Sequence, residues 1–440
     1  MKASNFARYA LGVCAATMLV GCGGVLRQAQ DDMRLSPSVG GPSCFDGACA
    51  ERSRSAQHDI TAERTHARPA YSVLFSFKGK SGVFPYAGLL DVNGTLDGTT
   101  LIGGAKCSPR GCGTVFAITT SGKETVLHSF AFQPDAGDPA AGLLNVNGTL
   151  YGTTIAGGAN CYTYAGCGAV FAIATSGKET VLYSFGGSGD GKNPYAGLIN
   201  VKGTLYGTTY YGGANGDGTV FAITTSGTET MLYSFDGKTG ANPDAGLINV
   251  KGTLYGTTEN GGTTYCEGSE YCGTVFAITR SGKETVLHNF GGSGDGTYPE
   301  AALINVKGTF YGTTMGGGVN CSASYGCGTV FAITPSGKET VLHSFGGSGD
   351  GSYPRAGLIN VKGTLYGTTF IGGANGSGTV FSITSSGKET VLHSFAGGTD
   401  GAQPLAGLVD FKGTLYGTTS YGGAKCNGST GCGTVFALTP

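Results

Sequence analysis

One unit of 49 to 56 residues is repeated seven times along this chain, and this repetition restricts the fold more than any other feature of the sequence. The shortest interval separates Gly203 from Gly252, and the longest separates Gly252 from Gly308. The clearest marker of the unit is Gly-Thr-Leu-Tyr-Gly-Thr-Thr, in which the first copy has Asp97 for tyrosine and the fifth has Phe310 for leucine. The seven copies begin at Gly94, Gly148, Gly203, Gly252, Gly308, Gly363 and Gly413.

Each of the first six units contains four runs that are typical of β-strands. In the second unit they cover residues 141–146, 149–154, 168–174 and 179–185, and Asn147-Gly148 predicts a tight hairpin between the first two. With 83 glycines among 440 residues, a helical bundle is excluded, and the glycines follow no collagen triplet. A hydrophobic fraction of 40 % argues against disorder. The chain is therefore predicted to be all-β.

The distribution of these runs predicts a closed ring. The last unit stops after its third run at Pro440, whereas an extra fourth run, Tyr71 to Phe77, precedes the first unit. An amino-terminal strand that completes the last sheet closes a ring, and an open solenoid would gain nothing from this permutation. We therefore expect a seven-bladed β-propeller of four-stranded antiparallel blades, in which Tyr71 to Phe77 pair with Gly433 to Thr439. A parallel β-helix is the alternative, although its rungs are shorter.

The repeated runs resemble those of a known bacterial family. Gly-Thr-Leu-Tyr-Gly-Thr-Thr, Gly-Gly, Gly-Thr-Val-Phe-Ala-Ile-Thr and Ser-Gly-Lys-Glu-Thr-Val-Leu follow one another in a pattern similar to the Gloeo/Verruco (GloVer) tandem repeat of exported, surface-anchored proteins. The resemblance covers about residues 71–440. It implies an extracellular location and no particular activity. Because tryptophan is absent, the WD, kelch and Asp-box signatures are missing, which argues against sialidase and WD-scaffold interpretations.

The amino terminus is typical of a secretory signal. Lys2 and Arg8 precede a short apolar run, residues 10–20, which is too short to span a membrane. The following Leu-Val-Gly-Cys resembles the bacterial lipoprotein box, which implies that Cys22 carries a lipid. Ordinary signal cleavage beside a chance cysteine is the alternative. Gly23 is not the aspartate that retains many such lipoproteins at the inner membrane, so an outer-membrane or cell-surface location is favoured.

Three segments follow from these observations. Residues 1–22 are the predicted lipoprotein signal peptide, and residues 70–440 are the predicted propeller. Residues 23–69 are rich in charge, show no apolar period and are predicted to be a disordered tether. Cys44 and Cys49 could form a local disulfide within it.

The cysteines of the propeller follow the repeat. Units three and six lack both members of a pair, and cysteines that are lost together are expected to be bonded to each other in an oxidising compartment. A zinc site would need two pairs to converge and lacks the Cys-x-x-Cys spacing, so we expect disulfides and no metal. The predicted pairs are Cys107–Cys112, Cys161–Cys167, Cys266–Cys272, Cys321–Cys327 and Cys426–Cys432.

Two positions differ from unit to unit on an otherwise constant background. One lies between a proline and the alanine of the first strand, at the expected channel mouth: Tyr86, Ala140, Tyr195, Asp244, Glu300, Arg355 and Leu405. The other follows the second strand: Leu101, Ile155, Tyr210, Glu259, Met315, Phe370 and Ser420.

Acidic and aromatic residues gather in units three to five of this rim. We predict a ligand rim on one face, where the two loops of variable length emerge, with Asp244 and Glu300 exposed and unpaired. Acids beside aromatic rings suit a sugar or a cationic group. Neutral variation of exposed loops is the alternative. The candidate rim consists of Tyr195, Tyr210, Asp244, Glu259, Glu300 and Arg355, with Tyr211, Glu267 and Glu270 beside it.

Other recurring polar residues are interpreted as structural. His128, His288, His343 and His393 share a strand position with tyrosine and phenylalanine, so we expect packing rather than a ligand or a base. The glutamate that begins each fourth strand, such as Glu179, is expected to pair with a neighbour such as Lys178. Three loops of sequence Gly-Gly-Ser-Gly-Asp-Gly are interpreted as glycine-rich turns, since one aspartate such as Asp190 is a weak calcium signal.

The sequence favours a non-enzymatic binding or adhesion module. We find no Ser/His/Asp set, P-loop or His-Glu-x-x-His motif, and a net charge of −1 does not support binding to nucleic acid. A propeller enzyme that uses Asp244 and Glu300 as acid and base is one alternative, and a structural envelope protein is another. We expect a monomer without cofactor that contacts the membrane only through its lipid.

Overall fold

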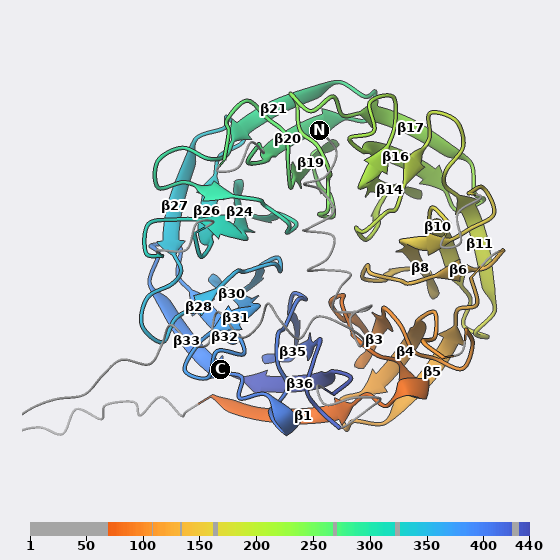
Figure 1. Cartoon of the computed structure of the whole chain (residues 1–440), viewed down its shortest axis with the longest axis horizontal. Helices are drawn as coiled ribbons and strands as arrows, with labels where there is room; N and C mark the ends of the chain where they lie inside the picture. Colours follow the sequence, from red (N-terminus) through yellow and green to blue (C-terminus); the bar gives the residue numbers. More distant parts are fainter. Residues whose placement is uncertain are drawn as a thin grey trace, which may run out of the picture. The chain divides into compact units, whose positions relative to one another are not determined.

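The computed structural model describes residues 69–107, 109–132, 134–161, 166–266, 271–321, 326–424 and 431–440. The described residues form seven four-stranded antiparallel sheets that are arranged as blades in a ring (Figure 1). The predicted all-β, seven-bladed propeller is therefore confirmed. The predicted signal peptide, with Cys22, and the tether cysteines Cys44 and Cys49 lie outside the described residues.

The blades are numbered after the repeat units. Their strands are β2 (Leu90–Val92), β3 (Thr95–Thr100), β4 (Thr114–Thr119) and β5 (Glu124–Ser129) in blade 1; β7 (Leu144–Val146), β8 (Thr149–Thr154), β10 (Ala169–Ile173) and β11 (Glu179–Ser184) in blade 2; β13 (Ile199–Val201), β14 (Thr204–Thr209), β16 (Thr219–Thr224) and β17 (Glu229–Ser234) in blade 3; β18 (Ile248–Val250), β19 (Thr253–Thr258), β20 (Thr274–Thr279) and β21 (Glu284–Asn289) in blade 4; β23 (Ile304–Val306), β24 (Thr309–Thr314), β26 (Thr329–Ile333) and β27 (Glu339–Ser344) in blade 5; β29 (Ile359–Val361), β30 (Thr364–Thr369), β32 (Thr379–Ile383) and β33 (Glu389–Ser394) in blade 6; and β34 (Val409–Phe411), β35 (Thr414–Thr419), β36 (Thr434–Thr439) and β1 (Ala70–Ser76) in blade 7.

Short two-residue strands and two 3-10 turns complete the described secondary structure. The short strands form the pairs β6 (Ala136–Gly137) with β9 (Ala156–Gly157), β12 (Gly191–Lys192) with β15 (Tyr211–Gly212), β22 (Gly296–Thr297) with β25 (Gly316–Gly317), and β28 (Gly351–Ser352) with β31 (Ile371–Gly372). The 3-10 turns are η1 (Gly79–Ser81) and η2 (Gly398–Asp400).

The amino-terminal strand closes the ring as predicted. β1 pairs antiparallel with β36, from Ala70 opposite Thr439 to Ser76 opposite Thr434. The Phe77 N–H then donates to the Gly433 carbonyl at 3.0 Å. The last blade therefore contains both ends of the described chain. Its third strand, β36, is paired on both sides, with β35 and with β1.

The first strand of each blade is shorter than expected because the chain turns into the centre of the ring before it. In blade 2 it begins at Leu144 rather than at residue 141. A Cβ atom on Gly197 would lie 3.1 Å from the Gly142 carbonyl oxygen of the preceding blade, so neighbouring backbones touch here. Small side chains are therefore required around the axis, and the equivalent residues are Gly88, Gly142, Gly197, Gly246, Ala302, Gly357 and Gly407.

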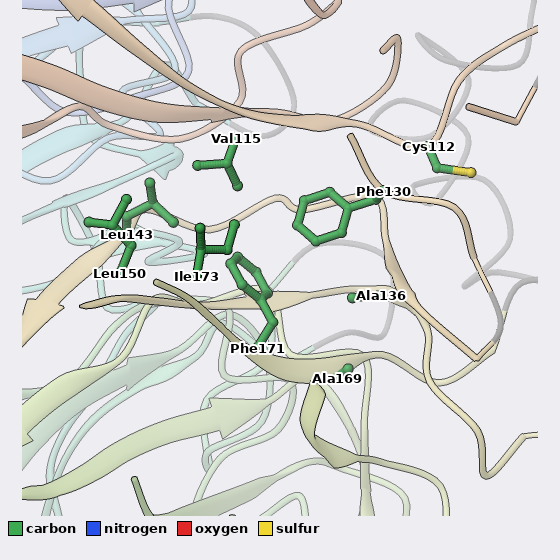
Figure 2. Packing of buried hydrophobic residues seen from close by; sticks show 9 residues of the cluster. All are labelled: Cys112, Val115, Phe130, Ala136, Leu143, Leu150, Ala169, Phe171 and Ile173. Atoms are coloured by element: carbon green, nitrogen blue, oxygen red, sulfur yellow. The ribbon is translucent and has the colours of Figure 1, made fainter. Parts of the chain in front are cut away.

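Aromatic packing joins each blade to the next. Between blades 1 and 2, the rings of Phe130 and Phe171 meet edge to face at 5.1 Å among buried aliphatic side chains (Figure 2). A Cβ on Gly152 would lie 2.4 Å from the Phe171 ring, which explains the invariant second glycine of the repeat marker. Complete burial of each phenylalanine contributes on the order of 2–3 kcal/mol, so this repeated contact is a major source of stability.

A belt of threonines in the second strand of each blade links neighbouring blades. The Thr153 hydroxyl of β8 donates to the Ala196 carbonyl of the next blade at 2.8 Å. The same bond recurs around the ring, and Thr418 of β35 donates to Ala87 at 3.5 Å, which joins blade 7 to blade 1. The belt thus provides a second, polar closure of the ring.

Candidate ligand-binding site at the ring axis

The two loops of variable length lie on one face and pair with each other. In blade 3, β12 comes from the loop that enters the blade, and β15 comes from the loop after β14; the two strands are hydrogen-bonded. The three other short pairs repeat this arrangement. The prediction that both variable loops share a face is therefore confirmed, and we call this side the decorated face.

Disulfides fasten the decorated face. Within the described residues, four of the five predicted bonds are present, namely Cys107–Cys112, Cys161–Cys167, Cys266–Cys272 and Cys321–Cys327. Cys426 lies outside the described residues, so the Cys426–Cys432 pair stays a prediction.

A strained backbone position presents the two variable rim residues of each unit. The residue before each rim proline has a left-handed conformation, with φ of 53° at Asn193 and 56° at Asn242. The Asn193 carbonyl accepts the Tyr210 N–H at 3.1 Å, and the Asn242 side-chain amide donates to the Tyr210 carbonyl at 3.0 Å. Strand ends from successive blades are thus locked together. The left-handed residues are Phe84, Asp138, Asn193, Asn242, Tyr298, Tyr353 and Gln403.

Rim residues from five blades converge around the axis. The charges of Glu300, Glu259 and Arg355 all act on the ionisation of Asp244. The same four groups also act on Tyr86, which belongs to blade 1 on the other side of the ring. We call the group that they form with Tyr210 the axial cluster: Tyr86, Tyr210, Asp244, Glu259, Glu300 and Arg355.

Tyr210 holds one side of the axial cluster. Its hydroxyl donates to Glu259 Oε2 at 2.6 Å, a short hydrogen bond to a carboxylate. Its ring lies 5.2 Å from that of Tyr195 and 4.7 Å from that of Tyr211. Burial, followed by the Glu259 charge and hydrogen bond, raises the pKa of Tyr210, so the phenol stays protonated.

Arg355 holds the other side. Its Nε lies 3.5 Å from Glu300 Oε2, which makes an ion pair but not a well-formed hydrogen bond. The guanidinium also donates to Met315 Sδ at 3.1 Å and lies 5.3 Å from the centre of the Phe370 ring. Burial opposes its charge, but the surrounding acids outweigh burial and raise the pKa of Arg355.

The expectation that Glu300 is exposed and unpaired is therefore wrong, and Asp244, which was expected to be exposed, is also partly buried. Its side chain is only 10 % exposed and is paired with Arg355 of the next blade. Adjacent blades meet closely at the axis, so an acid in unit five reaches a base in unit six. Glu267 and Glu270 lie outside the described residues.

Asp244 is an acid whose ionisation is strongly opposed by its surroundings. Burial raises its pKa well above the usual value, repulsion from Glu300 and Glu259 raises it further, and Arg355 opposes both effects. Its side chain is nevertheless partly exposed to solvent, although protein surrounds it on several sides. Within the described ranges, no protein group donates a hydrogen bond to this carboxylate. Asp244 is thus an acceptor without a donor.

The sector opposite the acids is apolar. Leu101, Ile102 and Ala140 form a small buried cluster, against which Tyr86 and Tyr195 pack. The rim is therefore asymmetric, with charged groups from blades 4 to 6 on one side and hydrocarbon from blades 1 and 2 on the other.

A different polar arrangement recurs at the outer edge of the ring, where β5, β21 and β27 are outermost strands (Figure 1). His288 packs edge-on against Phe290 at 4.8 Å, so the expected packing role is confirmed. Its Nε2 also lies 3.0 Å from Asp295 Oδ2. Glu339 of the next blade offers an oxygen within 4.8 Å of both groups. The glutamate thus faces the preceding blade, rather than serving only its neighbouring lysine.

The aspartate of each Gly-Gly-Ser-Gly-Asp-Gly loop belongs to this outer arrangement. Asp190 Oδ2 accepts the Gly186 N–H at 3.0 Å and the Tyr183 hydroxyl at 3.1 Å, and Oδ1 accepts the Gly191 N–H at 2.7 Å. These bonds hold a glycine-rich turn, as the sequence indicated.

The sequence profile of the Gloeobacter/Verrucomicrobia repeat matches residues 54–268 and 262–440. The chain belongs to this family. The GloVer resemblance seen in the repeats is thereby confirmed, and it covers every blade. No curated protein sequence matches the chain.

Several solved structures are similar to this GloVer-repeat chain at low identity. A gluconolactonase from Xanthomonas campestris is 12 % identical with a TM-score of 0.41, over 84 % of this chain and 89 % of that one. The acylaminoacyl peptidase of Pyrococcus horikoshii is 9 % identical with a TM-score of 0.43, over 82 % and 53 %. The tricorn protease is 10 % identical with a TM-score of 0.39, over 76 % and 27 %, so the chain spans about a quarter of that protein.

These similarities concern the fold alone. Among the described residues of the GloVer-repeat chain, no helix is long and apolar enough to cross a membrane.

Proposed function

We propose that the chain is an exported, lipid-anchored propeller that binds a small extracellular ligand at the axial cluster, through a cationic group of that ligand. The observation that carries this proposal is the meeting of Asp244, Glu259 and Glu300 with a single guanidinium among the described residues, that of Arg355. An ammonium group beside Asp244 would donate a hydrogen bond to a carboxylate that has no other donor among the described residues. Its positive charge would also reduce the repulsion among the three acids.

The aromatic and apolar parts of the rim fit the same ligand. Tyr86 and Tyr210 lie within reach of the acids, and aromatic faces attract cations by roughly 0.5–2 kcal/mol. The partly exposed rings of Tyr86 and Tyr195, which pack on the apolar sector, would contact the carbon skeleton. An amine-bearing glycan or another small ammonium compound satisfies both halves, and the asymmetric rim would hold it in one orientation.

The test is a binding screen of neutral and amine-bearing glycans and of simple amines. Asp244→Asn and the double change Asp244→Asn with Glu300→Gln should weaken binding of any hit by about tenfold or more, in keeping with charge-assisted hydrogen bonds of about 1.5–3 kcal/mol. Glu124→Gln at the outer edge, which also removes one carboxylate, should leave binding unchanged. A hit that binds all variants equally would refute the axial site.

An enzymatic role is the second candidate, and the environment of Asp244 favours it. A carboxyl group whose pKa is raised by burial, beside Glu300 paired with a guanidinium, resembles an acid and base whose pKa values have been separated. Turnover of a bound glycan that Asp244→Asn abolishes even at saturating substrate, where weaker binding no longer limits the rate, would support catalysis. Binding without turnover would leave a binding module. No binding in either assay would favour the structural envelope role.

Export and lipid attachment rest on the leader and on the disulfides. The sequence before Cys22 resembles a lipoprotein box, and disulfides are typical of exported proteins. Cys22→Ser should therefore release the protein from membranes into the soluble exported fraction. A Cys22→Ser protein that stays in the membrane after carbonate washing would place the anchor elsewhere.

A further inference from the structure

We propose that three interfaces between neighbouring blades each bind a divalent transition-metal ion, best matched by Zn2+, through one histidine, one aspartate and one glutamate. Each histidine and aspartate come from one blade, and the glutamate begins the outermost strand of the next. The three sets are His128, Asp135 and Glu179; His288, Asp295 and Glu339; and His343, Asp350 and Glu389. These sites lie at the outer edge and are independent of the axial cluster.

The donor set has the geometry and charge of a zinc site. In each set, one nitrogen and two carboxylate oxygens lie within 4.8 Å of one another. Bonds of about 2.0–2.2 Å in a tetrahedron place ligand atoms roughly 3.5 Å apart, so a small side-chain rotation completes the set. His288 Nε2 and Asp295 Oδ2 are already 3.0 Å apart. One imidazole and two carboxylates suit Zn2+, balance its charge and leave a position for water.

Each set also contains a buried acceptor that an ion would satisfy. Oε1 of Glu339 is buried and, within the described residues, has no hydrogen-bond partner. The same holds for Glu179 and Glu389 of the other two sets, and also for Glu124 and Glu284, which begin outermost strands at interfaces without a complete set. The unpaired oxygen is therefore common to these glutamates, and the histidine and aspartate distinguish the three sets. A buried carboxylate oxygen without a partner is costly, and metal coordination would satisfy it.

The aspartate is held in place by the backbone, as metal ligands usually are. The Gly296 N–H donates to Asp295 Oδ1 at 2.6 Å, and the Gly291 N–H donates to Oδ2 at 3.2 Å. Bonds of this kind orient a ligand before the metal arrives. The His288 side chain remains 21 % exposed, so an ion can reach the site from solvent.

The repeat provides internal controls in which one ligand is missing. In blade 2, Tyr183 replaces the histidine and bonds to Asp190 at 3.1 Å. At the closure of the ring, Tyr71 replaces the glutamate and stacks on His393 at 3.7 Å. These two interfaces show that the fold accepts tyrosine at either position.

The three sites should differ in affinity. His128 Nε2 lies 3.8 Å from Asp135 Oδ2, farther than at the two other sites, and the charge of Lys106 acts on Asp135. A neighbouring cation repels a metal ion. The site of blades 1 and 2 should therefore fill last.

The experiment counts zinc on the full chain, purified without a polyhistidine tag and with its disulfides oxidised. The protein is stripped with a chelator, equilibrated with Zn2+, dialysed and measured by elemental mass spectrometry. The wild-type chain should hold three more equivalents than the triple variant His128→Tyr, His288→Tyr and His343→Tyr. This variant copies the natural residue of blade 2, so circular dichroism should show an intact fold.

Two further variants make the result decisive. His393→Tyr removes a histidine from the interface that lacks the glutamate and should retain all three equivalents. Glu339→Gln should lose one equivalent. This single variant tests the proposal if the triple variant does not fold. The proposal would be overturned if the wild-type chain, Glu339→Gln and the triple variant all held the same amount of zinc. It would also be overturned if His393→Tyr lost one equivalent.

Discussion

The inner and outer ends of the blades follow opposite rules. At the inner end, the residue after each rim proline changes from Tyr86 to Asp244 to Arg355, although the scaffold around it repeats. At the outer end, the combination of His288, Asp295 and Glu339 returns at other interfaces with little change.

The geometry of a ring accounts for this difference. An outer residue contacts only the adjoining blade, so each interface can carry its own copy of one arrangement. An inner residue faces the shared axis, where charged groups of blades 4 to 6 affect the ionisation of Tyr86 in blade 1. One change at the axis therefore alters a single common site, whereas one change at the edge alters one of several equivalent sites.

The largest effect should come from the outer strand that closes the ring. Deleting the chain up to Phe77 removes β1, exposes the edge of β36 and leaves Phe116 without its partner Phe77, whose ring lies 5.0 Å away. We expect loss of cooperative unfolding, measured by calorimetry. The matched control starts at Pro69, retains β1 and should unfold like the full chain. Similar unfolding of both truncated proteins would contradict the closure.

At the inner end, Arg355→Met should destabilise the protein most strongly at high pH. It leaves Glu300 and Asp244 without their cation, at a cost of about 2 kcal/mol, which is less than for a fully buried pair because the Arg355 side chain is 22 % exposed. The folded-state pKa of Asp244 is already raised, and loss of Arg355 should raise it further. A raised carboxyl pKa costs stability as pH rises, so the loss should shrink toward acidic pH.

Denaturant titrations at pH 5 and pH 8 check this expectation. The double variant Arg355→Met with Glu300→Gln should lose less stability than Arg355→Met alone, because one of the uncompensated acids is gone. A loss that is equal at both pH values would mean that electrostatics at the axis are unimportant.

The sequence was sufficient for features that depend on counting and on order along the chain. Counting the runs places the strand that ends before Phe77 in the last blade, and the units that lack both cysteines predict the pair Cys161–Cys167; the structure contains both. The differing residues at the rim also indicate Asp244 as a candidate site residue from the sequence alone.

The sequence was insufficient for contacts across the ring and between blades. Tyr86 stood in the same series of rim residues, but chain order does not tell that blade 1 faces blades 4 and 5. The outer sets cannot be predicted in the same way, because Glu339 lies in the unit after that of His288 and only the packing of neighbouring blades brings them together. The constant seven-residue interval between His288 and Asp295 was the available signal.

A smaller effect concerns an acid inside the inner half of blade 1. Asp97 of β3 is 5 % exposed and occupies the position of a tyrosine in the other units. Burial, and then repulsion from Asp91, raises its pKa to about 6. Asp97→Tyr should therefore stabilise the protein by about 1–2 kcal/mol at pH 8, through packing and through removal of a buried charge.

The pH dependence separates these two causes. The folded-state pKa of Asp97 is above its unfolded value, so its charge costs stability that appears as pH rises from about 4 to 6 and is absent below that window. The gain from Asp97→Tyr should accordingly be smaller at pH 4 than at pH 8. The reverse change in blade 2, Tyr151→Asp, should destabilise. A gain that is independent of pH would mean that packing alone is responsible.

The smallest effect tests whether the inner end also contains a part that repeats. The threonine belt lies beneath the variable rim, and its bonds differ in length, from 2.8 Å for Thr153 to Ala196 to 3.5 Å for Thr418 to Ala87. Replacement by valine keeps the size and the β-branch but leaves a buried carbonyl without this donor, at a cost of about 1 kcal/mol. Thr153→Val should cost this full amount, whereas Thr418→Val should cost less because the longer bond is weaker. Both side chains are almost fully buried, so the comparison in thermal unfolding isolates bond quality from exposure. A larger loss for Thr418→Val would instead mean that the ring depends more on its closing interface than on the others, and that the inner ends are less uniform than their repeated threonines indicate.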